Sequence, residues 1–224
     1  MTSRMIINLR RESVPRLSAE TRELITATTR DRAFECASSL LREEGWKRFT
    51  MEKLARRMGV SKGTLYNYFK DKEAVIFFIR DAISLCVAEK IHQEMVQEPD
   101  TRKLLQMIVL RSLEGMKEYR FLQLALGSIM IRRQSEKAEG SSESLPEDSS
   151  TDHIYHALVD VLKRGMEDGS VRSGDPYVMA AVLNAALVGV DMGERFYRDV
   201  DMGSSDARQE IVTTLLQGLC KEEQ

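Results

Sequence analysis

The sequence contains few of the residues that mark secreted, fibrous or disulfide-stabilised proteins. Its 224 residues include three cysteines, four prolines and 13 glycines, and only 6% of them are aromatic. Cys36, Cys86 and Cys220 lie far apart and form no CxxC pair, so we expect neither a disulfide framework nor a structural zinc site. The low proline and glycine content, with 42% hydrophobic and 30% charged residues, is typical of a globular chain.

Long hydrophobic runs are also lacking. The short apolar run Met5–Ile7 is followed by Arg10 and Arg11, so no signal peptide is predicted. The most apolar stretch, Val178–Val190, contains Asn184 and is too short to cross a bilayer. We therefore expect a cytoplasmic protein that makes no membrane contact.

Charge is distributed unevenly along the chain, although the net charge is only −2. Residues 1–72 contain 16 Lys and Arg against 9 Asp and Glu, which gives +7, whereas the remaining residues contain 17 against 26, which gives −9. A basic N-terminal part indicates that this end of the molecule meets a polyanion such as DNA. Chance clustering is the alternative, so the interpretation depends on the motifs.

Apolar residues recur at helical spacing along most of the chain, and we find no alternating strand pattern and no internal repeat. The composition of residues 1–27 predicts a flexible basic arm, and the Ser- and Glu-rich stretch 135–150 predicts a disordered loop. The expected fold is all-α, with about nine helices. They are predicted at 28–44, 51–58, 62–69, 72–96, 104–119, 121–133, 152–167, 176–197 and 205–219.

Two short helices joined by a tight turn are predicted in the basic part. Thr50 and Ser61 are suited to cap these helices, because their hydroxyls can accept hydrogen bonds from free backbone N–H groups. Gly59, between the helices, can adopt the left-handed conformation that ends the first of them. Leu65 and Phe69 lie four residues apart and form an apolar face toward the preceding helix. This pattern predicts a helix-turn-helix.

Lys62 and Lys72 open two successive predicted helices, where the helix dipole disfavours a cation. The free N–H groups at helix starts favour a bound anion, and DNA phosphates would account for both lysines. Lys, Asn and Thr side chains can contact base edges when a helix enters the major groove. Solvated lysines and locally packed tyrosines are the alternatives. The exposed face of the predicted helix 62–69 carries Lys62, Thr64, Tyr66, Asn67 and Tyr68.

A distinctive stretch occupies residues 50–72 and reads TMEKLARRMGVSKGTLYNYFKDK, with GW at 45–46 before it and EAV after it. It resembles the DNA-binding signature of the TetR family of bacterial transcriptional regulators, and the resemblance covers about a fifth of the chain. By position it implies that Thr50, Ser61, Thr64, Tyr68 and Lys72 anchor the DNA backbone. The residues that it implies for base reading are Lys62, Gly63, Tyr66 and Asn67.

The resemblance also implies a domain organisation. A three-helix DNA-binding head is expected at 28–73, and a larger helical ligand-binding and dimerisation domain at 74–224, with the fourth helix as the link. The last two long helices are expected to pair with those of a second subunit. The resemblance thus implies a repressor that binds a palindromic double-stranded operator as a homodimer and releases it when a small-molecule effector binds.

Several helices in 74–224 carry more apolar residues than one buried stripe requires, which favours a largely apolar effector site. Ordinary core packing is the alternative for each apolar candidate. The polar groups most able to orient a ligand are Arg111, Tyr119, His92, His156 and Asn184, of which Arg111 and Asn184 are included among the candidates. The full set of candidates is Met107, Leu110, Arg111, Met116, Leu126, Met130, Tyr155, Leu158, Leu162, Leu183 and Asn184.

Catalytic and metal-binding motifs are not found. No P-loop, GxSxG, HExxH or dinucleotide fingerprint is present, so we expect no enzymatic activity. Asp152, His153 and His156 follow a predicted loop with no cysteine nearby, so neither a metal site nor another cofactor is predicted. Two alternatives to a repressor stay open: an activator, and a DNA-bound adaptor whose C-terminal domain binds a protein partner.

Overall fold

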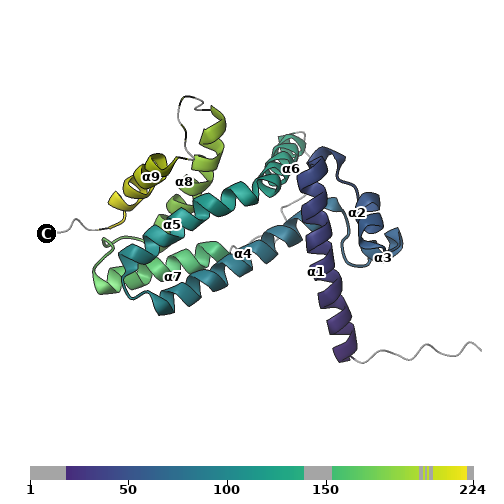
Figure 1. The fold of residues 1–224 in the computed structure, drawn as a ribbon, viewed down its shortest axis with the longest axis horizontal. Helices are drawn as coiled ribbons and strands as arrows, with labels where there is room; N and C mark the ends of the chain where they lie inside the picture. The colour runs from purple at the N-terminus through teal and green to yellow at the C-terminus, as the bar shows by residue number, and fades with distance from the viewer. Residues whose placement is uncertain (1–18, 139–152, 197–198, 200, 202–203, 221–224) are drawn as a thin grey trace, which may run out of the picture.

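The structure is a computed structural model that describes residues 19–138, 153–196, 199, 201 and 204–220. This described part contains nine α-helices and one 3₁₀ helix, η1, and has no β-strand (Figure 1). The predicted all-α fold is therefore confirmed. The segments 1–18 of the predicted arm and 139–150 of the predicted loop lie outside the described residues.

Most helices begin and end close to the predicted positions. They are α1 (Ala19–Glu44), η1 (Trp46–Arg48), α2 (Met51–Met58), α3 (Lys62–Tyr66), α4 (Lys72–Gln97), α5 (Thr101–Glu118), α6 (Arg120–Ala138), α7 (His153–Asp168), α8 (Pro176–Phe196) and α9 (Ser205–Gln217).

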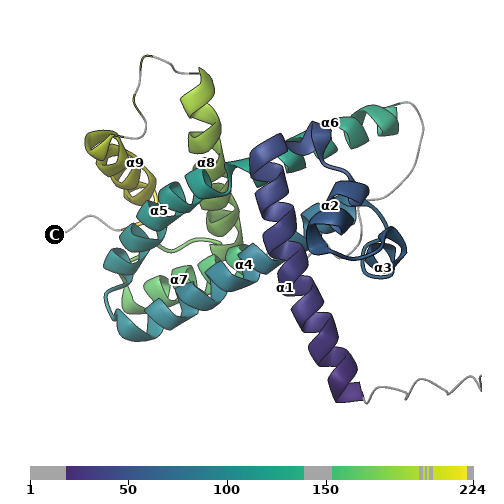
Figure 2. The same cartoon turned by 45° about the vertical axis from the view of Figure 1, so that its right-hand side comes forward.

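The helix α1 begins at Ala19, nine residues before the predicted start at residue 28. Residues 19–27 read AETRELITA, which contains several good helix formers and no proline or glycine. These residues extend an existing helix without needing an apolar stripe of their own. Figures 1 and 2 show this first part of α1 extending away from the other helices.

The helix α3 is shorter than predicted, since it ends at Tyr66 and not at residue 69. The N–H of Asn67 is shared between the carbonyls of Gly63 and Thr64, and the chain tightens into a turn. The turn brings Phe69 into the core, where its ring packs against Phe78 with a centroid distance of 5.2 Å.

The helix α6 extends four residues into the predicted loop, to Ala138. Two contacts one helical turn apart accompany this extension. The Ser135 hydroxyl donates to the Ile131 carbonyl at 3.2 Å, and Arg132 pairs with Glu136 at 3.7 Å. The Arg132–Glu136 ion pair is of the kind that stabilises a helix, and the Ser135 hydroxyl finds a partner on the helix backbone. The polar composition of 135–136 is therefore compatible with helix.

The buried side chains form two clusters. We call the first one the head cluster, which combines α1, the turn after η1, α2, α3, the first half of α4 and three residues of α6 (Figure 2). Its buried members are Ala33, Ala37, Leu40, Leu41, Phe49, Met51, Leu54, Ala55, Met58, Leu65, Phe69, Val75, Ile76, Ile79, Leu122, Ala125 and Ile129.

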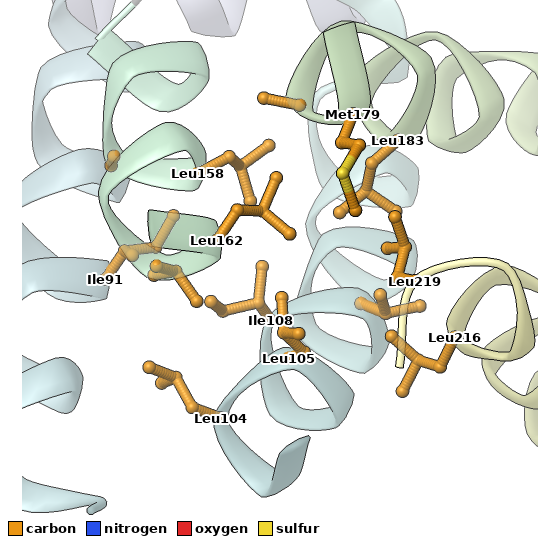
Figure 3. Close-up of a cluster of buried hydrophobic side chains, with 14 of the residues drawn as sticks. Ile91, Leu104, Leu105, Ile108, Leu158, Leu162, Met179, Leu183, Leu216 and Leu219 are labelled. Atoms are coloured by element: carbon orange, nitrogen blue, oxygen red, sulfur yellow. The ribbon is translucent and has the colours of Figure 1, made fainter. Parts of the chain in front are cut away.

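We call the second one the body cluster, in which the second half of α4 packs with α5, α7, α8 and α9. Figure 3 shows its side chains pointing toward one another from these helices. The helix α4 contributes to both clusters, with Ile76 in the first and Ile91 in the second. The labelled members are Ile91, Leu104, Leu105, Ile108, Leu158, Leu162, Met179, Leu183, Leu216 and Leu219.

One face of α8 carries exposed small or apolar side chains. Val178 and Val182 are 58% and 62% exposed in the single chain, and Ala181, Ala185 and Gly189 on the same helix are exposed as well. In the part of the chain that the structure describes, every helix is too short or too polar to cross a membrane.

Candidate nucleic-acid interface

The predicted helix-turn-helix is formed by α2, the turn at Gly59 and α3. The Thr50 hydroxyl caps α2 by accepting from the Lys53 N–H at 3.3 Å, and the Ser61 hydroxyl caps α3 by accepting from the Thr64 N–H at 3.0 Å. Gly59 has a φ of 68°, in the left-handed region that favours glycine. These local features, all predicted from the sequence, are confirmed.

The orientation of α3 follows from its one buried side chain. Leu65 is fully buried against α2, together with Leu54 and Ala55. Because a helix of this length buries only one face, the opposite side of α3 stays in solvent. The candidates for base reading lie there: Lys62, Gly63, Tyr66 and Asn67 are all exposed.

The candidates for backbone anchoring surround this exposed face. Thr50, Ser61 and Thr64 are exposed, and the hydroxyls of Ser61 and Thr64 are hydrogen-bonded to each other at 2.8 Å. Tyr68 is half-buried and packs against the head cluster, so part of its ring has a structural role. Lys72 is half-buried at the start of α4.

The Lys62 ammonium already has an anionic partner inside the protein. Its Nζ lies 2.6 Å from Oε1 of Glu52 on α2 and 5.9 Å from the centre of the Tyr66 ring. Hydrogen bonding and Coulombic attraction to Lys62 lower the pKa of Glu52, and the same contact raises the pKa of Lys62. Sequence reasoning missed Glu52, because nothing local indicates that residues ten apart in two helices meet.

Lys72 is positioned by an aromatic ring. Its Nζ lies 4.1 Å from the centre of the Trp46 ring, which is a cation–π geometry. Trp46 in turn stacks on the buried Phe49, with a centroid distance of 6.0 Å. Asp71 caps α4 by accepting from the Ala74 N–H at 2.8 Å. The ammonium thus stands at the first turn of α4, on the rim of the helix-turn-helix.

Other basic residues of this region differ in how they are paired. Arg57 on α2 bonds both the Ser39 hydroxyl and the Glu43 carboxylate of α1, and this contact lowers the pKa of Glu43 to about 2. Lys53 pairs with Glu44. Four further basic side chains on η1, on α2 and beside α3 are exposed: Lys47, Arg48, Arg56 and Lys70.

The start of α4 is also tied to α6. Glu73 is a buried carboxylate that receives hydrogen bonds from Arg132 and Arg133, with Nη2 of Arg133 at 2.7 Å from Oε2. The Arg133 guanidinium lies 5.3 Å from the centre of the Phe77 ring, one turn along α4. Because Glu73 is the neighbour of Lys72 in the chain, these contacts link the position of Lys72 to the position of α6 on the head cluster.

The structure brings together six of the candidate effector residues. Leu158, Leu162 and Leu183 are buried in the body cluster, and Leu110, Met116 and Tyr155 pack against it half-buried. Met107 on α5 and Asn184 on α8 are half-buried, and Arg111 is exposed and paired with Glu94. Two candidates on α6 lie elsewhere, since Leu126 packs against the head cluster and Met130 is exposed. Their role in ligand binding stays a prediction.

The chain was compared with known proteins. Residues 34–77 match the family model of the bacterial regulatory proteins of the tetR family. One relative is the HTH-type transcriptional regulator SAB2452 of Staphylococcus aureus (strain bovine RF122 / ET3-1), 40% identical over 50 residues. This alignment covers 22% of the chain and spans only about a quarter, 27%, of that relative's length.

Solved structures resemble the chain over most of its length. SmeT, the repressor of the Stenotrophomonas maltophilia multidrug efflux pump SmeDEF, has a TM-score of 0.61 at 21% identity, with 86% of this chain and 91% of SmeT covered. Thermus thermophilus FadR, a TetR-family repressor in complex with lauroyl-CoA, has a TM-score of 0.62 at 20% identity, with 87% and 97% covered. At this identity the likeness shows a common fold. Residues 34–77 thus match the DNA-binding domain of the tetR family of bacterial regulatory proteins, and the chain shares its overall fold with these two repressors.

Proposed function

We propose that this protein is a repressor that inserts α3 into the major groove of a palindromic operator as one half of a homodimer. The observation that carries the proposal is the exposed face of α3, on which Lys62, Tyr66 and Asn67 stand free of the core. Lysine can donate to guanine edges, and asparagine can pair with adenine. Gly63 has no side chain, so the backbone can approach the DNA closely.

The neighbouring hydroxyl and amine groups suit the phosphate backbone. Thr50 and Ser61 stand at the N-termini of α2 and α3, where free N–H groups and the helix dipole favour an anion. Thr64 and Tyr68 add hydroxyls at the edge of the same face. Lys72 supplies a positive charge whose position is limited by the Trp46 ring. Such contacts fix the protein on the duplex, while the face of α3 reads the sequence.

The homodimer is proposed to form through α8 and α9. The exposed residues Val178, Ala181, Val182, Ala185 and Gly189 follow helical spacing along one side of α8. Small residues allow two helices to approach closely, and burial of the two valines removes apolar area from water. A single helix-turn-helix contacts only one half-site, so a second copy provides the affinity that one head lacks.

Release from DNA is proposed to follow the binding of a largely apolar small molecule at the body cluster, which the second half of α4 forms with α5, α7, α8 and α9. The buried leucines and half-buried Met116 and Tyr155 of the body cluster offer apolar contacts of the required kind. The related fold of Thermus thermophilus FadR binds lauroyl-CoA, and we extend that ligand class to this chain. Such a ligand releases the DNA only if it binds the arrangement that cannot bind DNA more tightly than it binds the arrangement that can. The helix α4, which enters both clusters, is the proposed transmitter.

A mobility-shift experiment with a matched control tests the interface. Lys62→Ala/Asn67→Ala removes two exposed groups of α3, and Lys90→Ala/Gln93→Ala removes the same kinds of side chain from an exposed part of α4. We expect the first variant to lose the shift of duplex DNA and the second to keep it, with unchanged circular dichroism in both. Equal DNA binding by the two variants would contradict the proposal.

A further inference from the structure

The only tryptophan of the chain, Trp46, lies in η1 at the rim of the proposed DNA interface. Its ring stacks on the fully buried Phe49 at a centroid distance of 6.0 Å, and η1 packs against α1 and α6. The indole is therefore held in place by the head cluster. The Lys72 ammonium lies over this ring, with Nζ 4.1 Å from the ring centre. A flexible cation thus rests on an aromatic surface that the core fixes.

The acidic neighbours of Lys72 in the chain are both engaged elsewhere. The Asp71 carboxylate caps α4 by accepting from the Ala74 N–H, and Glu73 is buried and bonded to two arginines of α6. An aromatic ring attracts an ammonium through its quadrupole and carries no net charge. Trp46 therefore limits where Lys72 stands without neutralising it, whereas a carboxylate partner would cancel the charge that attracts a phosphate.

The ring contact is compatible with a phosphate contact. A lysine ammonium has three N–H donors, and the ring faces only one side of it. The other side can donate to a phosphate oxygen, so Lys72 does not have to leave Trp46 when DNA binds. A lysine that is immobilised on binding loses rotamer freedom, and a lysine already held by a ring loses less of it. The contact thus lowers the entropy cost of the phosphate contact.

We propose that Trp46 is a positioning residue for DNA binding, which holds the Lys72 ammonium where a phosphate meets the first turn of α4. The inference rests on the proposed DNA-binding function. A phosphate contact does not depend on base sequence, so loss of the ring weakens binding to every duplex by the same factor. Ordering one lysine corresponds to roughly twofold to tenfold in Kd per head. For a dimer on two half-sites the factor is squared, to about fourfold to hundredfold.

The first test is a double-mutant cycle on the full chain. Trp46→Leu removes the ring but keeps an apolar side chain, and Trp46→Phe keeps an aromatic face. The Kd is measured on one target duplex selected from a random pool and on one scrambled duplex. We expect Trp46→Leu to weaken both complexes equally and Trp46→Phe to retain most of the affinity. In the Lys72→Ala background, Trp46→Leu is expected to change the Kd less than about twofold, because the lysine that it positions is gone.

The salt dependence of Kd separates positioning from loss of charge. Each phosphate neutralised by a cation makes the slope of log K against log salt steeper by about 0.9. Lys72→Ala removes the cation and is expected to reduce the slope by about 0.9 per head. Trp46→Leu leaves the cation in the protein, so it is expected to raise the Kd at each salt concentration with an unchanged slope.

The fluorescence of Trp46 reports the contact in the protein without DNA, since no other tryptophan contributes. A cation 4.1 Å from the ring centre acts on the indole through its electric field. Lys72→Ala is therefore expected to shift the emission of the protein. Lys70→Ala is the matched control, because it removes the same charge from an exposed side chain two residues earlier, and it is expected to leave the emission unchanged.

Three results would overturn the positioning role while leaving the repressor proposal standing. They are equal weakening by Trp46→Leu with and without Lys72, a loss from Trp46→Phe as large as that from Trp46→Leu, and an emission that Lys72→Ala does not change. A structural effect through Phe49 alone would give the first of them. The emission and the Trp46→Phe measurement stay informative even if Trp46→Leu does not fold. Failure of the unmodified protein to bind any duplex would overturn both proposals.

Discussion

Replacement of Glu73 by glutamine is expected to weaken the attachment of α6 to the start of α4. Glu73 is buried and receives hydrogen bonds from Arg132 and Arg133. Glutamine keeps the size of the side chain and one carbonyl acceptor, but it removes the negative charge. The Arg133 guanidinium, whose side chain is 20% exposed, then loses its carboxylate partner and keeps its contact with Phe77.

The magnitude follows from the burial of the three side chains. Removal of one member of a fully buried ion pair costs about 3–5 kcal/mol in the free energy of unfolding. Glu73 is only 10% exposed, but Arg132 is 56% exposed, so water screens part of this interaction. We therefore expect a loss of roughly 2 kcal/mol, which corresponds to a fall of about 4–8 °C in Tm for a chain of this size.

The assay is urea unfolding followed by circular dichroism, with Tm as a second measure. Glu136→Gln is the control, because Glu136 pairs with the same Arg132 at 3.7 Å on the surface of α6. An exposed pair of this spacing contributes less than about 0.5 kcal/mol. Equal destabilisation by the two substitutions would refute the reasoning that burial of Glu73 decides the effect.

Three further predictions concern packing, recognition and assembly. Gly165→Ala should lower the free energy of unfolding by about 1–3 kcal/mol, because its Cβ would lie 2.3 Å from Val171 Cγ2. Gly127→Ala is the control, since its Cβ would meet no atom within 4 Å, and it should leave the free energy of unfolding equal or slightly higher in the same urea experiment. Lys72→Ala should weaken binding to every duplex by a similar factor. Asn67→Ala should instead reduce the free-energy preference for one base at one position of each half-site, by about 1–3 kcal/mol. A uniform loss of affinity from Asn67→Ala, measured on a set of single-base variants of the duplex, would count against base reading. Val182→Glu should convert the proposed dimer to a monomer in sedimentation velocity, and a persisting dimer would place the subunit interface elsewhere.

The local features of the helix-turn-helix could be predicted because each depends on a few consecutive residues. Thr50, Ser61 and Asp71 act as caps through bonds that span three residues, and Gly59 occupies the one position of the turn with a positive φ. The position of Leu65 on the buried face follows from its helical spacing. These signals predicted where both short helices begin and which face of α3 is exposed, but not that α3 ends at Tyr66.

The contacts that position the charged groups could not be predicted in the same way. Glu52 meets Lys62, Trp46 meets Lys72, and Glu73 meets Arg133 across 10, 26 and 60 residues of sequence. Such contacts depend on the angles between helices, which a pattern of apolar residues does not specify. Sequence reasoning therefore found the basic groups of the interface and missed the residues that hold them.

Helical periodicity also does not predict which other helices pack against each apolar face. Leu122, Ala125 and Ile129 follow helical spacing, and the structure buries them in the head cluster and not in the body cluster. The consequence is that α6 packs with the DNA-binding helices. The candidates Leu126 and Met130 on this helix are accordingly separated from those gathered around Leu158 and Leu162.

The most direct measurement is selection of bound sequences from a random duplex pool by the purified protein at physiological salt. Enrichment of a two-fold symmetric sequence, lost when Lys62 and Asn67 are replaced by alanine, is the expected result. Its half-site spacing would also report the separation of the two α3 helices in the dimer. Recovery of no preferred sequence, or of the same sequence by the variant, would contradict the account that α3 reads DNA.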